Sequence, residues 1–252
     1  MTRPRRLLTI PISHYCEKAR WALERAGLPY REERHVQGVN RLVSWRHGGH
    51  GTLPVLVCEA GALVESEAIL RYADAHLREA ERLFPDGADE VTALCRELDA
   101  GLGPDGRRLI YAHMLPRKAL MLEYNNAGVP RWEDTMLRRG WPLLARWGAA
   151  ALEVRPDTPE QDRPRVHAAF DAIAARLEDG RPYLFGERFT AADLTFAALA
   201  AAVVLPPEYG TPLPQPDVLP EPVGRDVRAF RAHPAGAFAL RLFGEHRRRP
   251  AG

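Results

Sequence analysis

One stretch of sequence decides the fold: Leu7-Leu8-Thr9-Ile10-Pro11-Ile12-Ser13-His14-Tyr15-Cys16-Glu17-Lys18-Ala19-Arg20-Trp21-Ala22-Leu23. It begins with an apolar run that is long enough for one buried strand, and the Pro-Ile-Ser that follows predicts a corner. Beyond the corner, apolar side chains recur at the spacing of a helix that packs on a sheet: Ala19, Trp21, Ala22, Leu23 and Ala26. Ser13 stands where this helix should begin, because a serine oxygen can accept from the first backbone N–H groups.

The spacing of Ser13 and Cys16 suggests a thiol site at the start of this helix. In redox proteins with a strand, a corner and a helix, Cys-x-x-Cys puts the first sulfur at the exposed helix end and the second one turn inside. Here serine holds the exposed position, so the chain has no intramolecular dithiol at this place. The hydroxyl can instead donate to the thiolate of another molecule, at a helix end that favours anions. The structural alternative is an N-cap at Ser13 and a small buried apolar residue at Cys16.

Length, charge and cysteine content exclude several classes of protein. The 252 residues allow one large domain or two small ones, and a formal net charge of +2 gives no general attraction to nucleic acid. No apolar run approaches the roughly 20 residues of a membrane span, and the N-terminus lacks the apolar segment of a secretory signal. Cys16, Cys58 and Cys95 form neither a disulfide framework nor a metal-binding pattern. We therefore expect a cytoplasmic protein without a metal, a nucleic-acid partner or a membrane partner.

The first third of the chain alternates strand and helix signals. After the first helix, the sequence predicts a strand over 28–36, a loop over 37–51 with one irregular helical turn, strands over 52–58 and 63–64, and a helix opening at Glu65-Ser66. The helical crossover predicts a parallel first pair of strands, and the hairpin predicts an antiparallel last pair. Pro54, near the start of the third strand, indicates an edge, a strand end or a cis bond in a tight corner.

The pattern changes at the breaker cluster Phe84-Pro85-Asp86-Gly87. Beyond it, the periodicity predicts helices alone, over 90–100, 105–125, 132–153, 159–178, 191–204 and 226–246. Thr190 and Asp193 form an N-capping device for an almost wholly apolar helix, which should be central and buried. Residues 205–224 are rich in proline and glycine, and we interpret them as an ordered loop on the surface or a mobile one.

Several motifs in this order resemble the glutathione S-transferase superfamily. They are Ser13-x-x-Cys16, Gly51-Thr52-Leu53-Pro54-Val55-Leu56, Leu63-Val64-Glu65-Ser66-Glu67-Ala68-Ile69-Leu70-Arg71-Tyr72 and Phe189-Thr190-Ala191-Ala192-Asp193-Leu194-Thr195. The resemblance covers nearly the whole chain and looks closest to a serine-type bacterial branch whose substrates are undefined. It implies an α/β plus all-α fold: a thioredoxin-like domain over residues 1–80 and an all-helical, substrate-binding domain over residues 88–252.

The resemblance also implies a glutathione site in the first domain. Its residues would be Ser13 at the sulfur and, along the rest of the tripeptide, Thr52, Leu53, Pro54, Glu65 and Ser66. The Leu53 backbone would pair with the cysteinyl part as an added strand would, with Pro54 shaping the corner. Glu65 and Ser66 would hold the γ-glutamyl amine and carboxylate, although the pair alone also fits a helix cap. Thr52 stands where relatives often carry a longer polar residue facing the glycyl end.

The second substrate should bind between the domains. Candidate residues for its pocket are Tyr15 from the corner and Arg107, Arg108, Tyr111 and His113 from the second domain. Tyr111 and His113 differ by two positions, so they cannot face the same way on a helix. For each of these side chains the alternative is a place in the core or on a solvated face.

The activity implied by the resemblance is conjugation of the glutathione thiolate to a small electrophile, with glutathione as co-substrate. Two alternatives stay open at this point: a glutathione-dependent isomerase, reductase or lyase on the same scaffold, and a non-enzymatic binding protein that kept the fold. The resemblance also implies a twofold homodimer.

Overall fold

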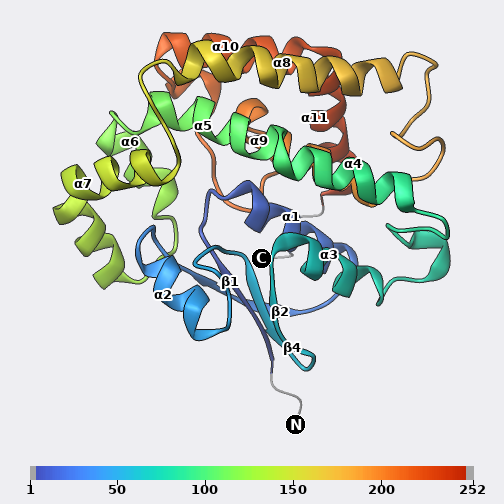
Figure 1. Ribbon diagram of the computed structural model, residues 1–252, viewed down its shortest axis with the longest axis horizontal. Coiled ribbons are helices and arrows are strands. Elements are labelled where there is room, and N and C mark those ends of the chain that lie inside the picture. The colour runs from blue at the N-terminus through green and yellow to red at the C-terminus, as the bar shows by residue number, and fades with distance from the viewer. Residues whose placement is uncertain (1–3, 248–252) are drawn as a thin grey trace.

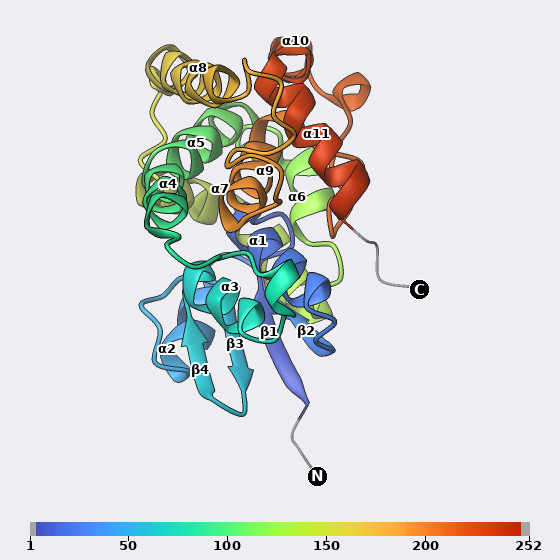
Figure 2. The ribbon, with the colours of Figure 1, turned by 90° about the vertical axis from the view of Figure 1, so that its right-hand side faces the viewer.

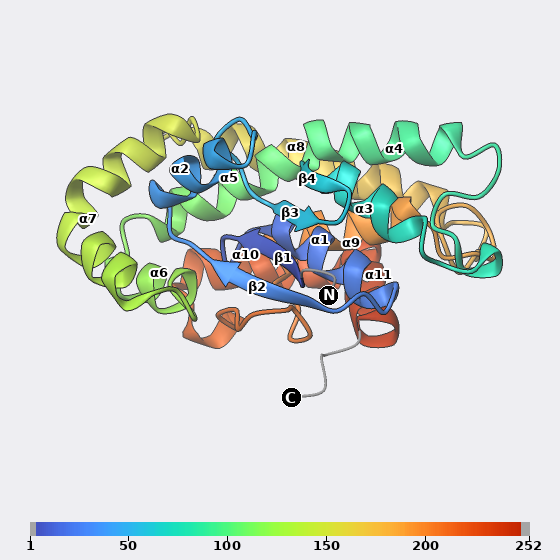
Figure 3. The same ribbon diagram turned by 90° about the horizontal axis from the view of Figure 1, so that it is seen from below.

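The computed structural model describes residues 4–247. They form a domain in which helices pack on a small sheet and, above it in Figure 1, a larger all-helical domain. The sheet has four strands in the order β2-β1-β3-β4, namely β1 Arg5–Thr9, β2 Tyr30–Arg34, β3 Val55–Cys58 and β4 Gly61–Val64. Strand β1 runs parallel to β2 and antiparallel to β3, and β3 pairs antiparallel with β4 (Figure 3). The predicted parallel crossover and the predicted hairpin are both confirmed, as is the thioredoxin-like domain followed by a mostly helical one.

Helix α1 joins the two parts of the molecule. It spans His14–Arg25, packs against α3 (Ser66–Asp74) above the sheet, and contacts α9 (Ala191–Val204) of the helical domain (Figure 2). The predicted core positions Ala19, Trp21, Ala22 and Leu23 are all buried. The start of α1 therefore lies where the sheet domain meets the helical domain.

Within residues 37–51, expected to be a loop with one irregular helical turn, the chain forms the regular helix α2 (Val39–Arg46). Its capping position, Gly38, offers no side chain to accept from the first N–H groups, so the usual start signal is missing. Leu42 and Trp45 are exposed, while Val39 is buried, so the apolar pattern does not mark a single face. Because of these two features, the sequence did not predict the helix.

Two long predicted helices are each divided at a proline. Residues 105–125 form α5 (Leu102–Met114) and α6 (Lys118–Asn125), and residues 226–246 belong to α10 (Glu221–Ala232) and α11 (Pro234–His246). Pro116 and Pro234 stand at the two breaks. Pro116 lacks the N–H that would continue α5, and His233, which precedes Pro234, has the extended backbone angles that a following proline favours. The other helices agree with prediction to within a few residues: α4 Asp89–Ala100, α7 Arg131–Ala151, α8 Thr158–Arg176 and α9 Ala191–Val204.

Helix α9 is the centre of the helical domain, as its apolar sequence predicts. It contacts α1, α4, α5, α10 and α11 (Figure 1). The Asp193 carboxylate accepts from the Thr190 backbone N–H at 2.7 Å and from the Leu184 N–H at 2.8 Å, which satisfies buried donors at the helix start. No helix among residues 4–247 is both long and apolar enough to cross a bilayer. The expected domain limits, 1–80 and 88–252, stay a prediction.

Candidate functional site

The corner before α1 holds Ser13 and Cys16 in different surroundings. Ser13 has extended backbone angles, and its Oγ accepts from the Cys16 N–H at 3.4 Å, so it is the N-cap of the helix. Cys16 is fully buried, its Sγ accepts from the Ile10 N–H at 3.4 Å, and burial raises the pKa of its thiol. Ser13 lines a cavity between the domains, whereas Cys16 does not line it.

This cavity has a volume of about 570 Å³. Nearly all the residues proposed from the sequence meet on its wall: Ser13, Tyr15, Thr52, Leu53, Pro54, Glu65, Ser66 and Tyr111. Asp99 and Arg107 from the helical domain also line it. Residues that lie more than fifty positions apart in the sequence therefore surround one space between the sheet domain and the helices.

Leu53 presents a free stretch of backbone to the cavity. The Leu53–Pro54 peptide bond is cis, and the Leu53 side chain is buried against β3. Within residues 4–247, neither the N–H nor the C=O of Leu53 has a hydrogen-bond partner. An extended peptide that paired with both groups would add a short strand at this place.

The start of α3 is a second unsatisfied part of the wall. Helix α3 has no side-chain cap among the described residues, so its first N–H groups remain available to an anion. Glu65, which precedes it, has a φ of 72°, a conformation that costs a non-glycine residue about 1–3 kcal/mol. Its carboxylate accepts from the Thr52 hydroxyl at 3.2 Å. This bond joins the residue shortly before β3 to the residue directly after β4 at the cavity wall.

Tyr15 lies on the wall, but its hydroxyl is already used. It donates to the Asp99 carbonyl oxygen at 2.8 Å, and burial raises the pKa of Tyr15 to about 12. Asp99 also accepts from Lys18 Nζ at 2.7 Å, and the Lys18 side chain is fully buried. These contacts join α1 to α4 beneath the cavity, which makes Tyr15 a fixed part of the domain junction.

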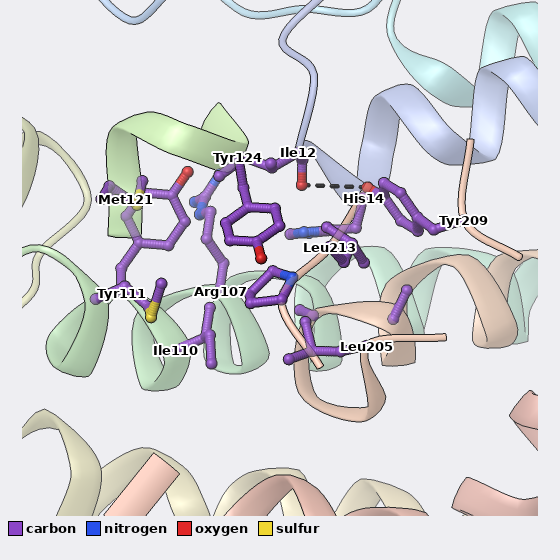
Figure 4. Close-up of a pocket in the computed structure, with 14 residues that line it drawn as sticks. Ile12, His14, Arg107, Ile110, Tyr111, Met121, Tyr124, Leu205, Tyr209 and Leu213 are labelled. Carbon is purple, nitrogen blue, oxygen red and sulfur yellow. Dashed lines mark hydrogen bonds between the residues drawn. The ribbon is translucent and has the colours of Figure 1, made fainter. Parts of the chain in front are cut away.

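A smaller and mostly apolar pocket of about 60 Å³ adjoins the cavity (Figure 4). Four residues line both spaces: Ile12, His14, Arg107 and Tyr111. The rest of its wall comes from α5, α6, the end of α9 and the segment after it, namely Ile110, Met114, Met121, Tyr124, Ala201, Ala202, Leu205, Tyr209, Leu213 and Pro214. The two spaces together offer a part with both polar and apolar walls beside Ser13 and a mostly apolar part behind it.

His14 is buried at the border of the two spaces. Its side chain is 4% exposed, its ring centroid lies 4.5 Å from that of Tyr15, and its Nε2 has no hydrogen-bond partner among the described residues. Burial, with the nearby charges of Arg107 and Lys18, lowers the pKa of His14 to about 3. The imidazole is therefore neutral at physiological pH.

This neutral histidine should make the protein less stable in acid. The unfolded chain binds a proton at His14 below its ordinary pKa of 6.5, whereas the folded chain binds it near 3, so stability present above pH 6.5 is lost as the pH falls through that window. We expect the free energy of unfolding of the wild type to fall by about 1.4 kcal/mol per pH unit more than that of His14→Gln between pH 6 and 4. Urea titrations at several pH values measure this difference, and parallel pH dependences for the two proteins would contradict it.

The structure does not bring Arg108 to either space, which corrects the sequence expectation for this residue. Its guanidinium donates to Asp162 on α8 at 2.7 Å and also pairs with Asp105, one turn earlier on α5. Arg107 takes its place on the wall. His113 lies against α10 near Val227, so it faces away from Tyr111, as the two-residue offset predicts.

The segment after α9 supports the corner from behind. The Tyr209 hydroxyl donates to the Ile12 carbonyl oxygen at 3.1 Å (dashed in Figure 4), and the Thr211 hydroxyl donates to the Pro11 carbonyl oxygen at 3.1 Å. Both side chains are buried, so residues 205–214 are not a loop that only covers the surface. No sequence signal linked these residues to the corner, because the contact depends on the packing of the whole helical domain.

A buried charge network lies directly behind the corner. Arg20 Nη2 donates to the Pro11 carbonyl oxygen at 3.1 Å, while its Nε donates to Glu32 at 2.7 Å. Glu17, fully buried, accepts from Arg20 at 3.2 Å and from Arg247 Nε at 2.6 Å. Burial alone would lower the pKa of Arg20, but the Glu32 and Glu17 carboxylates raise it above its ordinary value. No local sequence pattern predicts this network, because its members lie on α1, on β2 and just after α11.

Helices α6 and α7 form an arm that reaches the sheet domain (Figure 1). Glu133 on α7 is buried and accepts from the Val36 N–H at 2.9 Å, and its other oxygen contacts His35 Nδ1 at 2.9 Å. Trp147 on the same helix lines the mouth of the cavity and lies under the Arg41 guanidinium, 5.4 Å from the ring centroid. The arm thus completes the outer wall.

Two family models match this chain. A model described as glutathione S-transferase, N-terminal domain, matches residues 7–81, and one described as glutathione S-transferase, C-terminal domain, matches residues 157–223. Together they cover more than half of the chain. A curated cytochrome P450 monooxygenase of Emericella nidulans is 32% identical over 97 residues, but the match spans only 38% of this chain and 16% of that protein's length.

Solved structures with the same fold include several glutathione transferases. One from Phanerochaete chrysosporium is 18% identical over all of both chains, with a TM-score of 0.67. A glutathione S-transferase of Ceriporiopsis subvermispora in complex with glutathione is 19% identical over 99% of this chain and all of that one, with a TM-score of 0.62. One from Methylobacterium radiotolerans, in complex with glutathione sulfonate, is 23% identical over 94% of this chain and 95% of that one, with a TM-score of 0.51. At these identities the likeness is one of fold.

Proposed function

Because this chain belongs to the glutathione S-transferase superfamily, we propose that it binds reduced glutathione in the cavity between its domains and transfers the thiolate to a small electrophile. The observation that carries this proposal is a set of groups on one wall that can still form hydrogen bonds: the Ser13 O–H, which donates to no described residue, the free backbone of Leu53 and the uncapped start of α3. The complexes of two structural neighbours with glutathione and glutathione sulfonate support the same ligand.

The proposed binding mode assigns one of these groups to each part of glutathione. The γ-glutamyl carboxylate would bind at Ser66 and the first N–H groups of α3, with Glu65 on its amine and Thr52 beside Glu65. The cysteinyl part would pair with the backbone of Leu53, whose direction is fixed by Pro54. Its sulfur would then lie at the Ser13 hydroxyl and the N-terminus of α1.

The chemistry at this position is activation of a thiol that the protein does not itself carry. A serine hydroxyl stays protonated and donates to the thiolate, and the helix N-terminus adds favourable electrostatic interaction, so both lower the pKa of the bound thiol. The thiolate attacks an electrophilic carbon, a sulfur–carbon bond forms, and the leaving group departs with its electron pair. No cysteine lines the cavity among the described residues, which favours conjugation over thiol–disulfide exchange.

Reduced glutathione should bind the wild type, and Ser66→Ala should weaken that binding. Loss of a hydrogen bond to a charged group costs about 1.5–3 kcal/mol, which is roughly a tenfold to hundredfold increase in Kd. Thr135→Ala is the control, because the Thr135 hydroxyl bonds only within α7. Calorimetry measures all three proteins, and no heat of binding to the wild type at millimolar glutathione would overturn the proposed ligand.

We also propose a twofold homodimer, as the superfamily resemblance implies. Light scattering at micromolar concentration should give twice the 28.2 kDa mass of the chain. A mass equal to that of one chain would contradict this.

A further inference from the structure

Arg107 is a cation without a counter-ion at the border of the two spaces. It lines both of them, and within residues 4–247 it makes no hydrogen bond or ion pair. Its neighbour Arg108, by contrast, pairs with Asp105 and Asp162. A guanidinium stays charged at any relevant pH, and a half-buried one without an acceptor is costly.

His14 adds a second unsatisfied polar group at the same border. Its Nε2 has no partner among the described residues, although the side chain is 4% exposed. Buried polar nitrogen atoms in folded proteins nearly always have a partner, so an unpaired one on a cavity wall indicates a ligand group. In Figure 4, His14 from α1 and Arg107 from α5 are among the side chains that surround the same pocket.

The carboxylates on the surrounding walls do not pair with Arg107. The smaller pocket of about 60 Å³, which we call the inner pocket, is lined by no aspartate or glutamate among the described residues. On the outer wall, Asp99 is paired with Lys18, Glu67 with Arg71, and Glu65 with the Thr52 hydroxyl. A ligand is therefore the remaining source of an acceptor for Arg107.

The volumes limit how such a ligand can lie. A cavity of about 150 Å³ takes one benzene molecule, so the inner pocket of about 60 Å³ holds only part of a ring or a short chain. The outer cavity of about 570 Å³ has room for the rest of the molecule beside glutathione. The apolar end would enter between Met121 and Leu205, with its polar end at Arg107.

We propose that the second substrate is a small, largely apolar electrophile with one carboxylate, which Arg107 binds while His14 hydrogen-bonds the same group. This inference rests on the proposed transferase function and names the substrate class of that site. A compact apolar electrophile without a negative charge fills the pocket but leaves the guanidinium unpaired. The carboxylate thus confers selectivity that the apolar wall cannot give.

Two chlorinated arenes test this as a matched pair: 4-chloro-3,5-dinitrobenzoate, which has the carboxylate, and 1-chloro-2,4-dinitrobenzene, which lacks it. In each reaction the thiolate sulfur bonds to the ring carbon that carries chlorine, and chloride leaves with the bonding electrons. We expect Arg107→Gln to lower kcat/KM for the benzoate at least tenfold more than it lowers kcat/KM for the neutral arene. Arg107→Lys should retain part of the benzoate activity, and Arg117→Gln, at an exposed arginine outside both spaces, should change neither.

An equal loss with both arenes, or a raised KM for glutathione, would overturn the inference, since Arg107 would then serve the fold or glutathione. Unchanged benzoate activity in Arg107→Gln would overturn it as well. Calorimetry with unreactive 3,5-dinitrobenzoate separates this inference from the transferase proposal. If 3,5-dinitrobenzoate binds, Arg107→Gln weakens that binding at least tenfold and neither arene is turned over, then the carboxylate site is supported and the transferase proposal fails. Turnover of the neutral arene with no effect of Arg107 on either measurement supports the transferase and rejects the carboxylate site.

Discussion

Ser13→Ala should lower kcat with glutathione and a neutral arene by at least tenfold. The substitution removes the hydroxyl that would donate to the thiolate, and a tenfold loss corresponds to about 1.4 kcal/mol of transition-state stabilisation. The apparent pKa of bound glutathione, read from the pH dependence of kcat, should rise at the same time. Stopped-flow or steady-state rates across pH 5.5–9 measure both quantities.

Cys16→Ala is the matched control for this experiment, because Cys16 lies one turn further along the same helix. It is fully buried and its thiol pKa is raised by burial, so it should be inert. Turnover should stay nearly intact while stability falls through lost packing. An inactive Cys16→Ala with an active Ser13→Ala, and Cys16 recovered as a mixed disulfide with glutathione, would make this a cysteine-type enzyme. Ser13→Cys should introduce that disulfide chemistry.

The largest loss of stability is expected for Arg247→Met. The Arg247 guanidinium pairs with Glu17 and Glu24, and the Arg247 and Glu17 side chains are 1% and 0% exposed. Without Arg247, the buried Glu17 keeps its contact with Arg20, but Arg20 also pairs with Glu32, so two carboxylates share one guanidinium. One buried negative charge is then uncompensated, which costs about 3–5 kcal/mol. Chemical denaturation followed by circular dichroism measures the free energy of unfolding.

Two further variants separate this mechanism from a general loss of packing. Arg228→Met removes an exposed pair with Glu221 and should cost less than about 1 kcal/mol. Glu17→Gln combined with Arg247→Met removes the uncompensated charge, so the double variant should be more stable than Arg247→Met alone. A double variant that is less stable would contradict the charge mechanism.

Most of the fold could be predicted from local sequence patterns. The strands of the sheet and the capped helix α9 were predictable, because alternation, apolar runs and the Thr190–Asp193 pair act over a few residues. Pro116 and Pro234 mark the places where two predicted helices are divided. Helical periodicity continues on both sides of each proline, so the sequence predicted one helix in each place. Helix α2 had no cap signal at all, so only its contacts in the folded chain reveal it.

The candidate site was predictable in its sheet half and less so in its helical half. Ser13, Pro54 and Ser66 stand in motifs at strand and helix ends, where spacing fixes direction. On α5, neighbouring residues point about 100° apart, so sequence alone could not choose Arg107 over Arg108. The contacts of Tyr209 with the corner and of Arg247 with α1 join parts of the chain that no local rule connects.

Those long-range contacts have a consequence for how the protein is made. A chain is synthesised from its N-terminus, so Ile12 is made 197 residues before its partner Tyr209, and Glu17 is made 230 residues before Arg247. A nascent chain that has released only its sheet domain carries the corner without either support. We therefore expect the chain to bind the thiol only after Arg247 has been synthesised, so nascent chains that stop short of this residue should not sequester glutathione.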